Sequence, residues 1–273
     1  MGYTVGIVCS IGVGPERGGR EANEDNYLVC QDEQAAWREG DGEHVQPVPG
    51  GEGTLLAVAD GMGGMEDGEL AATVAVRVMA KLYASGRPKD PERALRRYVL
   101  EAHDKLHARI GAEKRVRMGT TLTLVWVVDG QAAWVQVGDS RLYLYRSGEL
   151  RRLTRDQTSR EFAVRDGRRA EAYPEELAQS FIFGSRGLGN DATLRLDKAY
   201  DSGREPLRRG DRLLLATDGL TGVVDDVSIG DVLAHTHEPQ PAAVACMERA
   251  LARGSRDNVT VLVIRVDEPT LPP

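Results

Sequence analysis

The chain has 273 residues, of which 41% are hydrophobic and 28% are charged, and its formal net charge is −7. This composition is typical of a globular protein that buries its own core. The negative charge argues against a protein that mainly holds nucleic acid or anionic lipid. The longest apolar run, residues 121–128, is too short to cross a bilayer, so we expect no nucleic-acid or membrane partner.

The cysteines and the N-terminal segment indicate the cellular compartment in which the protein is expected. Cys9, Cys30 and Cys246 form no C-x-x-C pair and are odd in number, which predicts free thiols in a reducing environment. The N-terminal segment lacks a basic stretch before its apolar residues, and glycines interrupt it. We therefore expect a cytoplasmic protein.

The first half of the chain predicts one strand and two helices. Residues 31–53 are polar and rich in glycine and proline, which predicts a loop. The apolar run that follows predicts a buried strand ending at Asp60. Apolar residues at positions 70, 74, 78 and 82 predict a helix over 68–84. Asp90 as N-cap and Pro91 as first residue predict a second helix over 91–114.

The second half predicts mainly strands. Residues 119–150 predict three strands in succession, with a hairpin turn at Asp129-Gly130 and a further turn at Ser147-Gly148. Residues 155–192 are charged and weakly periodic, which predicts another loop. Two more strands lie within 211–219 and 257–266, and a third helix covers 241–253. Because hairpins connect the strands, we expect antiparallel sheets with helices outside them.

Acidic residues recur where the predicted strands begin or end. A single aspartate at a strand end is usually a turn former or a cap. Strand ends on one side of a sheet converge, however, and gathered carboxylates repel one another unless a cation neutralises them. An all-oxygen cluster suits Mg²⁺ or Mn²⁺ rather than zinc. The residues in such positions are Glu24, Asp25, Asp60, Asp139, Asp218 and Asp257.

Seven stretches, in this order, resemble the metal-dependent protein Ser/Thr phosphatases of type 2C, the PPM family, in its bacterial form. They are GGREANEDN, LAVADGMGG, MGTTLTLVWV, VQVGDSRLYLYRSGEL, LTRD, LLLATDGLTGVV and SRDNVTVLVI. Each is weak alone, but together they cover nearly the whole chain. The resemblance implies an α+β fold in four layers (α-β-β-α), a central sandwich of two antiparallel β-sheets flanked by helices on both sides. It also implies one catalytic domain over residues 1–268, with a flap at about 155–192 and a tail at 269–273.

The resemblance further implies two ions of Mn²⁺ or Mg²⁺ per chain, and possibly a third. Asp60 would bridge the two ions, and the carbonyl oxygen of Gly61 would bind one of them, since glycine lets the backbone approach closely. Asp218 and Asp257 would bind the other ion. The remaining roles fall to Asp25 as a ligand of a metal or its water, Glu24 and Asn258 beside it, and Asp139 with Asp218 in a third, weaker site.

The chemistry implied is hydrolysis of phosphoserine and phosphothreonine. Two ions lower the pKa of a bridging water and so supply hydroxide near neutral pH. Arg20 matches the arginine that grips the phosphate, and its guanidinium fork fits two phosphate oxygens. We therefore predict Arg20, Asp60 and Asp218 as catalytic residues. We expect a monomer that acts on phosphorylated proteins and opposes a Ser/Thr kinase of the same cell.

The sequence departs from the family in two places. Met62 and Met65 occupy the positions where eukaryotic and bacterial members, respectively, carry a histidine, so an imidazole acid is not provided. The flap reads LTRDQTS and FIFGSRGLG rather than the family's usual motifs. Two alternatives stay open. One is a pseudophosphatase that only binds phosphoproteins, and the other is a phosphatase for one dedicated regulator or a small phosphoester.

Overall fold

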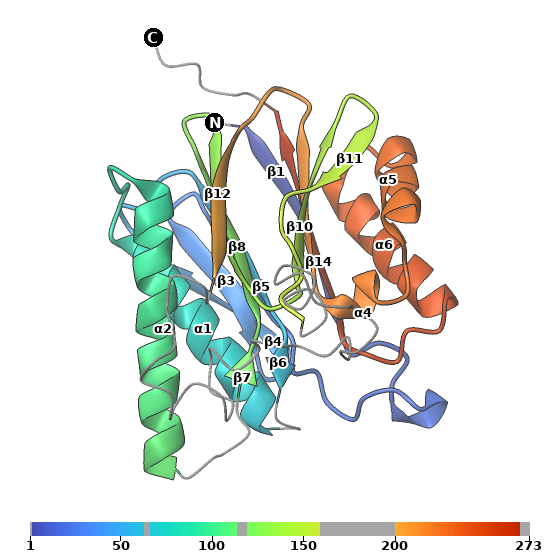
Figure 1. Ribbon diagram of the computed structural model, residues 1–273, viewed down its shortest axis with the longest axis horizontal. Coiled ribbons are helices and arrows are strands. Elements are labelled where there is room, and N and C mark those ends of the chain that lie inside the picture. Colours follow the sequence, from blue (N-terminus) through green and yellow to red (C-terminus); the bar gives the residue numbers. More distant parts are fainter. Residues whose placement is uncertain (1, 63–65, 114–118, 159–199, 268–273) are drawn as a thin grey trace, which may run out of the picture.

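The computed structural model in Figure 1 describes residues 2–62, 66–113, 119–158 and 200–267. One antiparallel sheet has five strands in the order β1 (Tyr3–Ser10), β14 (Val259–Val266), β13 (Arg212–Ala216), β10 (Arg141–Arg146) and β11 (Glu149–Arg152). The other has seven, in the order β12 (Asp201–Pro206), β9 (Gln131–Val137), β8 (Leu122–Val128), β5 (Thr54–Ala59), β2 (Asn26–Gln31), β3 (Gln34–Glu39) and β4 (Gly42–Pro47). A short pair joins β6 (Gly61–Met62) to β7 (Gly119–Thr120).

The helices cover the outer faces of the two sheets (Figure 1). The helices α1 (Glu66–Ala84) and α2 (Pro91–Glu113) lie on the seven-stranded sheet. The helices α4 (Asp218–Thr221), α5 (Asp226–His235) and α6 (Pro239–Ala252) lie on the five-stranded sheet, and a 3-10 turn, η1 (Pro15–Arg17), precedes β2. The expected four-layer α+β sandwich is confirmed. No helix in the described ranges combines the length and apolar character needed to span a membrane.

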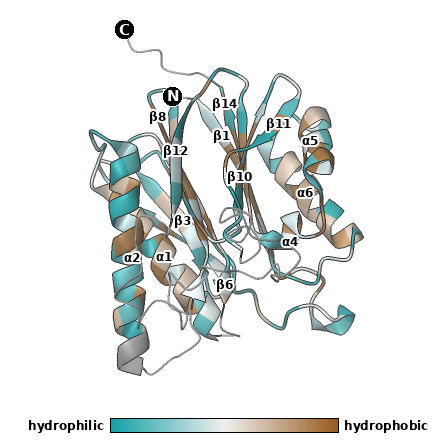
Figure 2. Cartoon of the chain, in the orientation of Figure 1, coloured by the Kyte–Doolittle hydropathy of each residue, from teal (hydrophilic) through white to brown (hydrophobic). Residues whose placement is uncertain are grey.

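Three apolar clusters hold the layers together, one between the sheets and one under each helical layer. Strand β8 shows how the pattern arises, because all seven of its residues are buried. Val125 and Val127 face the other sheet, whereas Leu124 and Trp126 pack beneath α1 and α2. A strand covered on both faces needs apolar residues at every position, which explains the unbroken run. Figure 2 shows hydrophobic residues concentrated in these inner layers.

The turns follow the expected chemistry. Asp129 and Gly130 both adopt positive φ, at 51° and 69°, in the hairpin between β8 and β9, as a two-residue turn requires. Ser147 and Gly148 do the same between β10 and β11, at 53° and 89°. The N-cap at Asp90 is also observed, because its carboxylate accepts a hydrogen bond from the backbone N–H of Arg93 at 3.1 Å.

The predicted loop over residues 31–53 is wrong in its central part. This segment forms β3 and β4, which extend the seven-stranded sheet beyond β2. A polar composition hides an alternation in which Ala35 and Trp37 are buried while their neighbours are not. Asp32 and Glu33 make the hairpin turn with positive φ. Antiparallel strands with only one covered face carry such mixed sequences.

The elements that were not predicted include β1, β12 and α5. Glycine breaks the apolar pattern of β1, yet β1 pairs along its whole length with β14. A Cβ at Gly6 would lie 2.2 Å from the backbone nitrogen of Gln240. The glycine therefore allows α6 to approach the strand closely. The expected flap, about residues 155–192, lies outside the described residues except for positions 155–158, where Gln157 and Thr158 are buried.

Candidate metal and phosphate site

Five aspartates lie at one end of the sandwich because neighbouring strands are antiparallel. Asp60 follows β5 and Asp25 precedes β2, and these strands pair with Ala59 opposite Asn26. In the other sheet, Asp218 follows β13, while Asp139 and Asp257 precede β10 and β14, the two strands that pair with β13. The end of each strand thus meets the start of its neighbour. The two sheets bring the two groups of acids together.

Two of these carboxylates have a buried oxygen for which the described part of the chain provides no hydrogen-bond partner. They are Oδ1 of Asp139 and Oδ1 of Asp218. Burial is the main cause that raises the pKa of Asp218, and the charge of Asp257 raises it further. Burial and the charge of Asp218 raise the pKa of Asp139 to about 7. Burial raises the pKa of Asp60 as well, with Asp218 the largest of its charged neighbours. A buried, unpaired carboxylate oxygen is unfavourable without a counter-charge.

Asp25 is the most deeply buried of the five, with 1% of its surface exposed. Its Oδ2 accepts hydrogen bonds from the hydroxyls of Thr217 at 2.8 Å and Thr260 at 2.7 Å. Burial raises its pKa to about 7, against these two hydrogen bonds, which lower it. Thr217 and Thr260 come from the five-stranded sheet, whereas Asp25 leads into the seven-stranded one. The carboxylate therefore joins the two sheets at the site.

The turn after β5 is held by Thr121. The backbone N–H of Asp60 donates to the Thr121 hydroxyl at 3.0 Å, and the Asp60 carbonyl oxygen accepts from the Thr121 N–H at 2.9 Å. The next residue, Gly61, has no room for a side chain. A Cβ there would lie 2.3 Å from the carbonyl oxygen of Gly68 and 2.5 Å from that of Glu24. Glycine at this position lets α1 and the Glu24 loop close around the turn.

Asn258 fastens the N-terminal loop to the start of β14. Its side-chain oxygen accepts the backbone N–H of Glu24 at 2.8 Å, and its amide donates to the carbonyls of Ile11 at 3.2 Å and Ala22 at 3.0 Å. Asn258 is 5% exposed. These three bonds fix the loop that carries Arg20 and Glu24 beside Asp257. The carboxylate of Glu24 packs against α1, where it leaves no space for a Cβ at Gly68.

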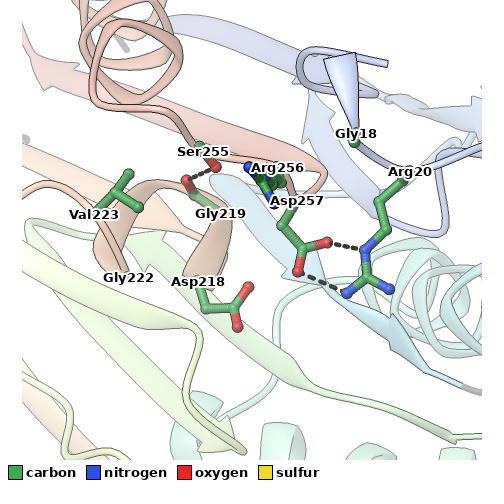
Figure 3. Close-up of a pocket in the computed structure, with 10 residues that line it drawn as sticks. Gly18, Arg20, Asp218, Gly219, Gly222, Val223, Ser255, Arg256 and Asp257 are labelled. Atoms are coloured by element: carbon green, nitrogen blue, oxygen red, sulfur yellow. Dashed lines mark hydrogen bonds and ion pairs between the residues drawn. The ribbon is translucent and has the colours of Figure 1, made fainter. Parts of the chain in front are cut away.

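Arg20 forms a two-pronged ion pair with Asp257 in Figure 3. Its Nε donates to Oδ1 at 2.8 Å and its Nη2 to Oδ2 at 2.7 Å. Both residues line a cavity of about 530 Å³ formed by residues 18–20, 218–219, 222–223 and 255–257. Asp218 lines the same cavity. The cavity therefore opens directly onto the carboxylate cluster.

The donor set fits a hard divalent cation. All the groups are oxygens, and two buried carboxylate oxygens are unpartnered. Within the described ranges, no three acidic, histidine or cysteine side chains are already gathered around one point as a finished ligand shell. Arg20 holds Asp257, and two threonine hydroxyls hold Asp25.

Several residues at this site were not predicted from the sequence. The threonines at 121, 217 and 260 stand in apolar strand sequences, where a polar residue indicates a buried hydrogen bond. Arg38 lies in β3, within residues 31–53, for which the sequence predicted a loop. Its guanidinium donates to the carbonyl oxygens of Asp25 at 2.9 Å and of Asn23. These residues hold the acidic groups in place without being acidic themselves.

The metal-free protein is expected to become more heat-stable when the pH falls from about 7.5 to about 5.5. Asp25, Asp60 and Asp139 have raised pKa values when folded, so the folded state binds protons that the unfolded state has released. Stability therefore falls as the pH rises through about 7. Burial lowers the pKa of His103, which makes stability rise with pH. This opposite effect comes from one group, against three aspartates. Differential scanning calorimetry in EDTA measures the effect.

Excess Mn²⁺ should reverse this pH dependence, because the cation replaces the protons and prefers the ionised carboxylates. A melting temperature in EDTA that rises steadily between the two pH values would contradict the charge repulsion assigned to the cluster. A Mn²⁺ effect of equal size on the Asp218→Asn variant would contradict binding at this cluster.

The fold and the five aspartates at one end of the sandwich define a class of protein. Its members bind a divalent cation through carboxylates at the edge of two facing sheets. The chain belongs to the protein phosphatase 2C family, whose pattern it matches over residues 20–254. The matched range includes the aspartates up to Asp218 and stops three residues before Asp257.

Individual relatives agree with the family. The chain is 34% identical over 215 residues to the serine/threonine protein phosphatase PstP of Mycobacterium tuberculosis, which covers 78% of this chain and 40% of PstP. It thus spans well under half the length of that relative. It is 29% identical to the serine/threonine phosphatase Stp of Listeria welshimeri, over 77% of this chain and 83% of Stp.

Solved structures are similar over nearly the whole chain. The catalytic domain of PstP in complex with two manganese ions superposes with a TM-score of 0.72 at 29% identity, covering 96% of this chain and 97% of that one. A second structure, PstP of Mycobacterium tuberculosis, gives a TM-score of 0.73 over 97% of this chain and 99% of that one, at the same identity. The likeness therefore includes the helical layers as well as the sheets.

Proposed function

We propose that this chain is a divalent-cation-dependent phosphatase of phosphoserine and phosphothreonine in proteins. The observation that carries the proposal is the pair of buried oxygens of Asp139 and Asp218 without a partner among the described residues, of which Asp218 lines a cavity together with Arg20. Negative groups without counter-charge supply the cation site, and Arg20 supplies the anion site. The names of the relatives, and the two manganese ions of the PstP structure, support the same reading.

The residues divide the work by position. We assign Asp60 and the Gly61 carbonyl as residues that would hold Mn²⁺ or Mg²⁺, with Asp60 shared between two ions. Asp218 and Asp257 would hold one ion from the five-stranded sheet, and Asp139 with Asp218 would offer a third, weaker position. Asp25 would hold an ion or its water, in the orientation that its two threonine partners fix. When bound, the cations neutralise phosphoryl charge and lower the pKa of a coordinated water.

Arg20 and Asp257 change partners in this scheme. The guanidinium fork that now meets two carboxylate oxygens presents the same geometry to two phosphate oxygens. Transfer of Arg20 to the substrate releases Asp257 for a cation. The exchange needs little rearrangement, since the side chain of Arg20 is 60% exposed and that of Asp257 is 36% exposed.

No histidine is assigned to protonate the leaving alkoxide. Met62 lies in β6, half-buried, at one of the two positions where the family places an imidazole. Met65, at the other, lies outside the described residues. We assign this proton to water in the open cavity, so the rate for an alkyl phosphate should depend more steeply on pH than that for p-nitrophenyl phosphate.

We further propose that the chain acts as a monomer on the targets of a Ser/Thr kinase of the same cell. Its three cysteines are all free, as expected in a reducing compartment. The test is hydrolysis of p-nitrophenyl phosphate and of phosphopeptides with Mn²⁺ and with EDTA. Hydrolysis that needs Mn²⁺ supports the proposal. Binding of phosphopeptide without hydrolysis would overturn it in favour of a phosphoprotein-binding module.

Changing Arg20 to alanine is expected to raise KM for a phosphopeptide by about tenfold or more, because a charge-assisted fork on the phosphate is lost. Arg20→Lys should recover only part of the loss, since an ammonium group cannot form the fork. Steady-state kinetics with saturating Mn²⁺ measure both. Arg17→Ala is the matched control, as Arg17 is exposed on the same loop in η1. Unchanged kcat and KM in Arg20→Ala would remove Arg20 from the site.

A further inference from the structure

A second arginine lines the cavity. Arg256 lies between Ser255 and Asp257, and all three line the cavity together with Arg20. Its side chain is exposed. Gly18 lies beside it, because a Cβ there would lie 4.0 Å from the guanidinium carbon of Arg256. The guanidinium therefore borders the cavity on the side where the N-terminal loop passes.

Within the part of the chain that the structure describes, Arg256 makes no ion pair, unlike Arg20 in the same cavity and the two arginines nearest to it in the sequence. Arg20 is neutralised by Asp257, and Arg249 and Arg253 on α6 and just after it are paired with Asp231 and Asp225. Figure 3 shows no interaction between Arg256 and the other residues drawn there. Its neighbour Ser255 is occupied, since its hydroxyl donates to the carbonyl of Gly219 at 2.7 Å. Among the described residues that line the cavity, Arg256 is the one cation without a carboxylate partner.

Apart from two aspartates and two arginines, the described residues that line the cavity carry no charge. They are Gly18, Gly19, Gly219, Gly222, Val223 and Ser255. The acidic groups, Asp218 and Asp257, are directed to the cation site and to Arg20. A peptide whose phosphate lies at Arg20 passes these neutral residues, and the unpaired positive charge that the described part of the lining offers it is that of Arg256. The cavity, about 530 Å³, has room for more than one phosphate group.

We propose that Arg256 selects phosphopeptides that carry an acidic residue close to the phosphoresidue. This inference rests on the proposed function, because it assumes that the phosphate is bound at Arg20. A flanking carboxylate accepts two hydrogen bonds from the free guanidinium. A basic flanking residue is disfavoured by the same charge, so Arg256 discriminates in both directions. The substrate class is acidic phosphopeptides.

The experiment compares pairs of phosphopeptides that differ only by Glu or Gln at one position within three residues of the phosphoserine, on either side. The measured quantity is the ratio of kcat/KM for the Glu peptide to that for the Gln peptide. For the best position, the wild type should favour Glu by about fivefold, in line with a partly exposed ion pair. Arg256→Gln should bring the ratio close to one, and Arg256→Glu should invert it. The preference should weaken at high salt.

Arg17→Gln is the matched control, since it removes one exposed arginine from the same end of the chain without touching the cavity lining, and it should keep the wild-type ratio. Equal ratios in the wild type and Arg256→Glu at every position would overturn the proposal. Binding titrations with fluorescently labelled versions of the same peptides give the corresponding ratio of dissociation constants. If no peptide is hydrolysed, the proposed phosphatase function is wrong. The ratio of peptide affinities still tests the role of Arg256 in that case.

Discussion

Replacing Asp60 or Asp218 by asparagine is expected to lower Mn²⁺-dependent kcat/KM for p-nitrophenyl phosphate by about 100-fold or more. Asparagine keeps the shape and one oxygen, but it removes the negative charge that a divalent cation requires. Both residues lie in the carboxylate cluster. The buried Oδ1 of Asp218 accepts no hydrogen bond from the described residues, so it is available as a metal ligand. Kinetics over a Mn²⁺ titration measure the loss, and isothermal titration calorimetry measures the weakened metal binding.

These variants should remain folded. In EDTA at neutral pH their melting temperatures should equal or exceed that of the wild type, because one of several mutually repelling carboxylates has been removed. Asp41→Asn is the control, since Asp41 is an exposed turn residue between β3 and β4 and should leave activity unchanged. Retention of more than about a tenth of the wild-type activity by either cluster variant would contradict the assignment of these residues.

Replacing Gly219 by alanine is expected to destabilise the protein by about 3 kcal/mol. A Cβ at Gly219 would lie 1.8 Å from the carbonyl oxygen of Asn258 and 2.8 Å from its carbonyl carbon. These atoms belong to the backbone, so no side chain can turn aside to make room. The strain falls on the start of β14, which follows Asp257, and on the segment that carries Asp218. Activity should fall together with the free energy of unfolding, measured by urea denaturation.

Gly230→Ala is the matched control for this substitution. Gly230 lies in α5, and its nearest contact for a Cβ is the Cβ of Leu150 at 3.4 Å, an ordinary van der Waals distance. Alanine is favoured over glycine within a helix by up to about 1 kcal/mol, so this variant should be as stable as the wild type or slightly more stable. Equal stability of the Gly219 and Gly230 variants would show that the turn after β13 is more adaptable than its packing indicates.

Much of the fold could be predicted because it depends on local patterns. The helix at 68–84 was predicted from its spacing of apolar residues, and the structure places α1 at Glu66–Ala84. The hairpin at Asp129-Gly130 followed from the conformational freedom of these two residues. Strands β5, β13 and β14 were visible as apolar runs bounded by acidic turns. The error over residues 31–53 has the opposite cause, since β3 is specified by one buried face, Ala35 and Trp37, within a polar composition.

By itself, the sequence determined the elements whose signals lie within a few residues, the Asp-Gly turns that end two strands, and the family, through motifs in a fixed order. Only the tertiary structure decided which groups meet. Thr217 reaches Asp25 across 192 positions, Arg20 reaches Asp257 across 237, and Asn258 reaches Glu24 across 234. No local propensity encodes such contacts, because they depend on which strands pair and on how two sheets face each other. Among the described residues, the same long-range packing leaves two carboxylate oxygens and the guanidinium of Arg256 without partners, and the proposed chemistry of the site rests on these groups.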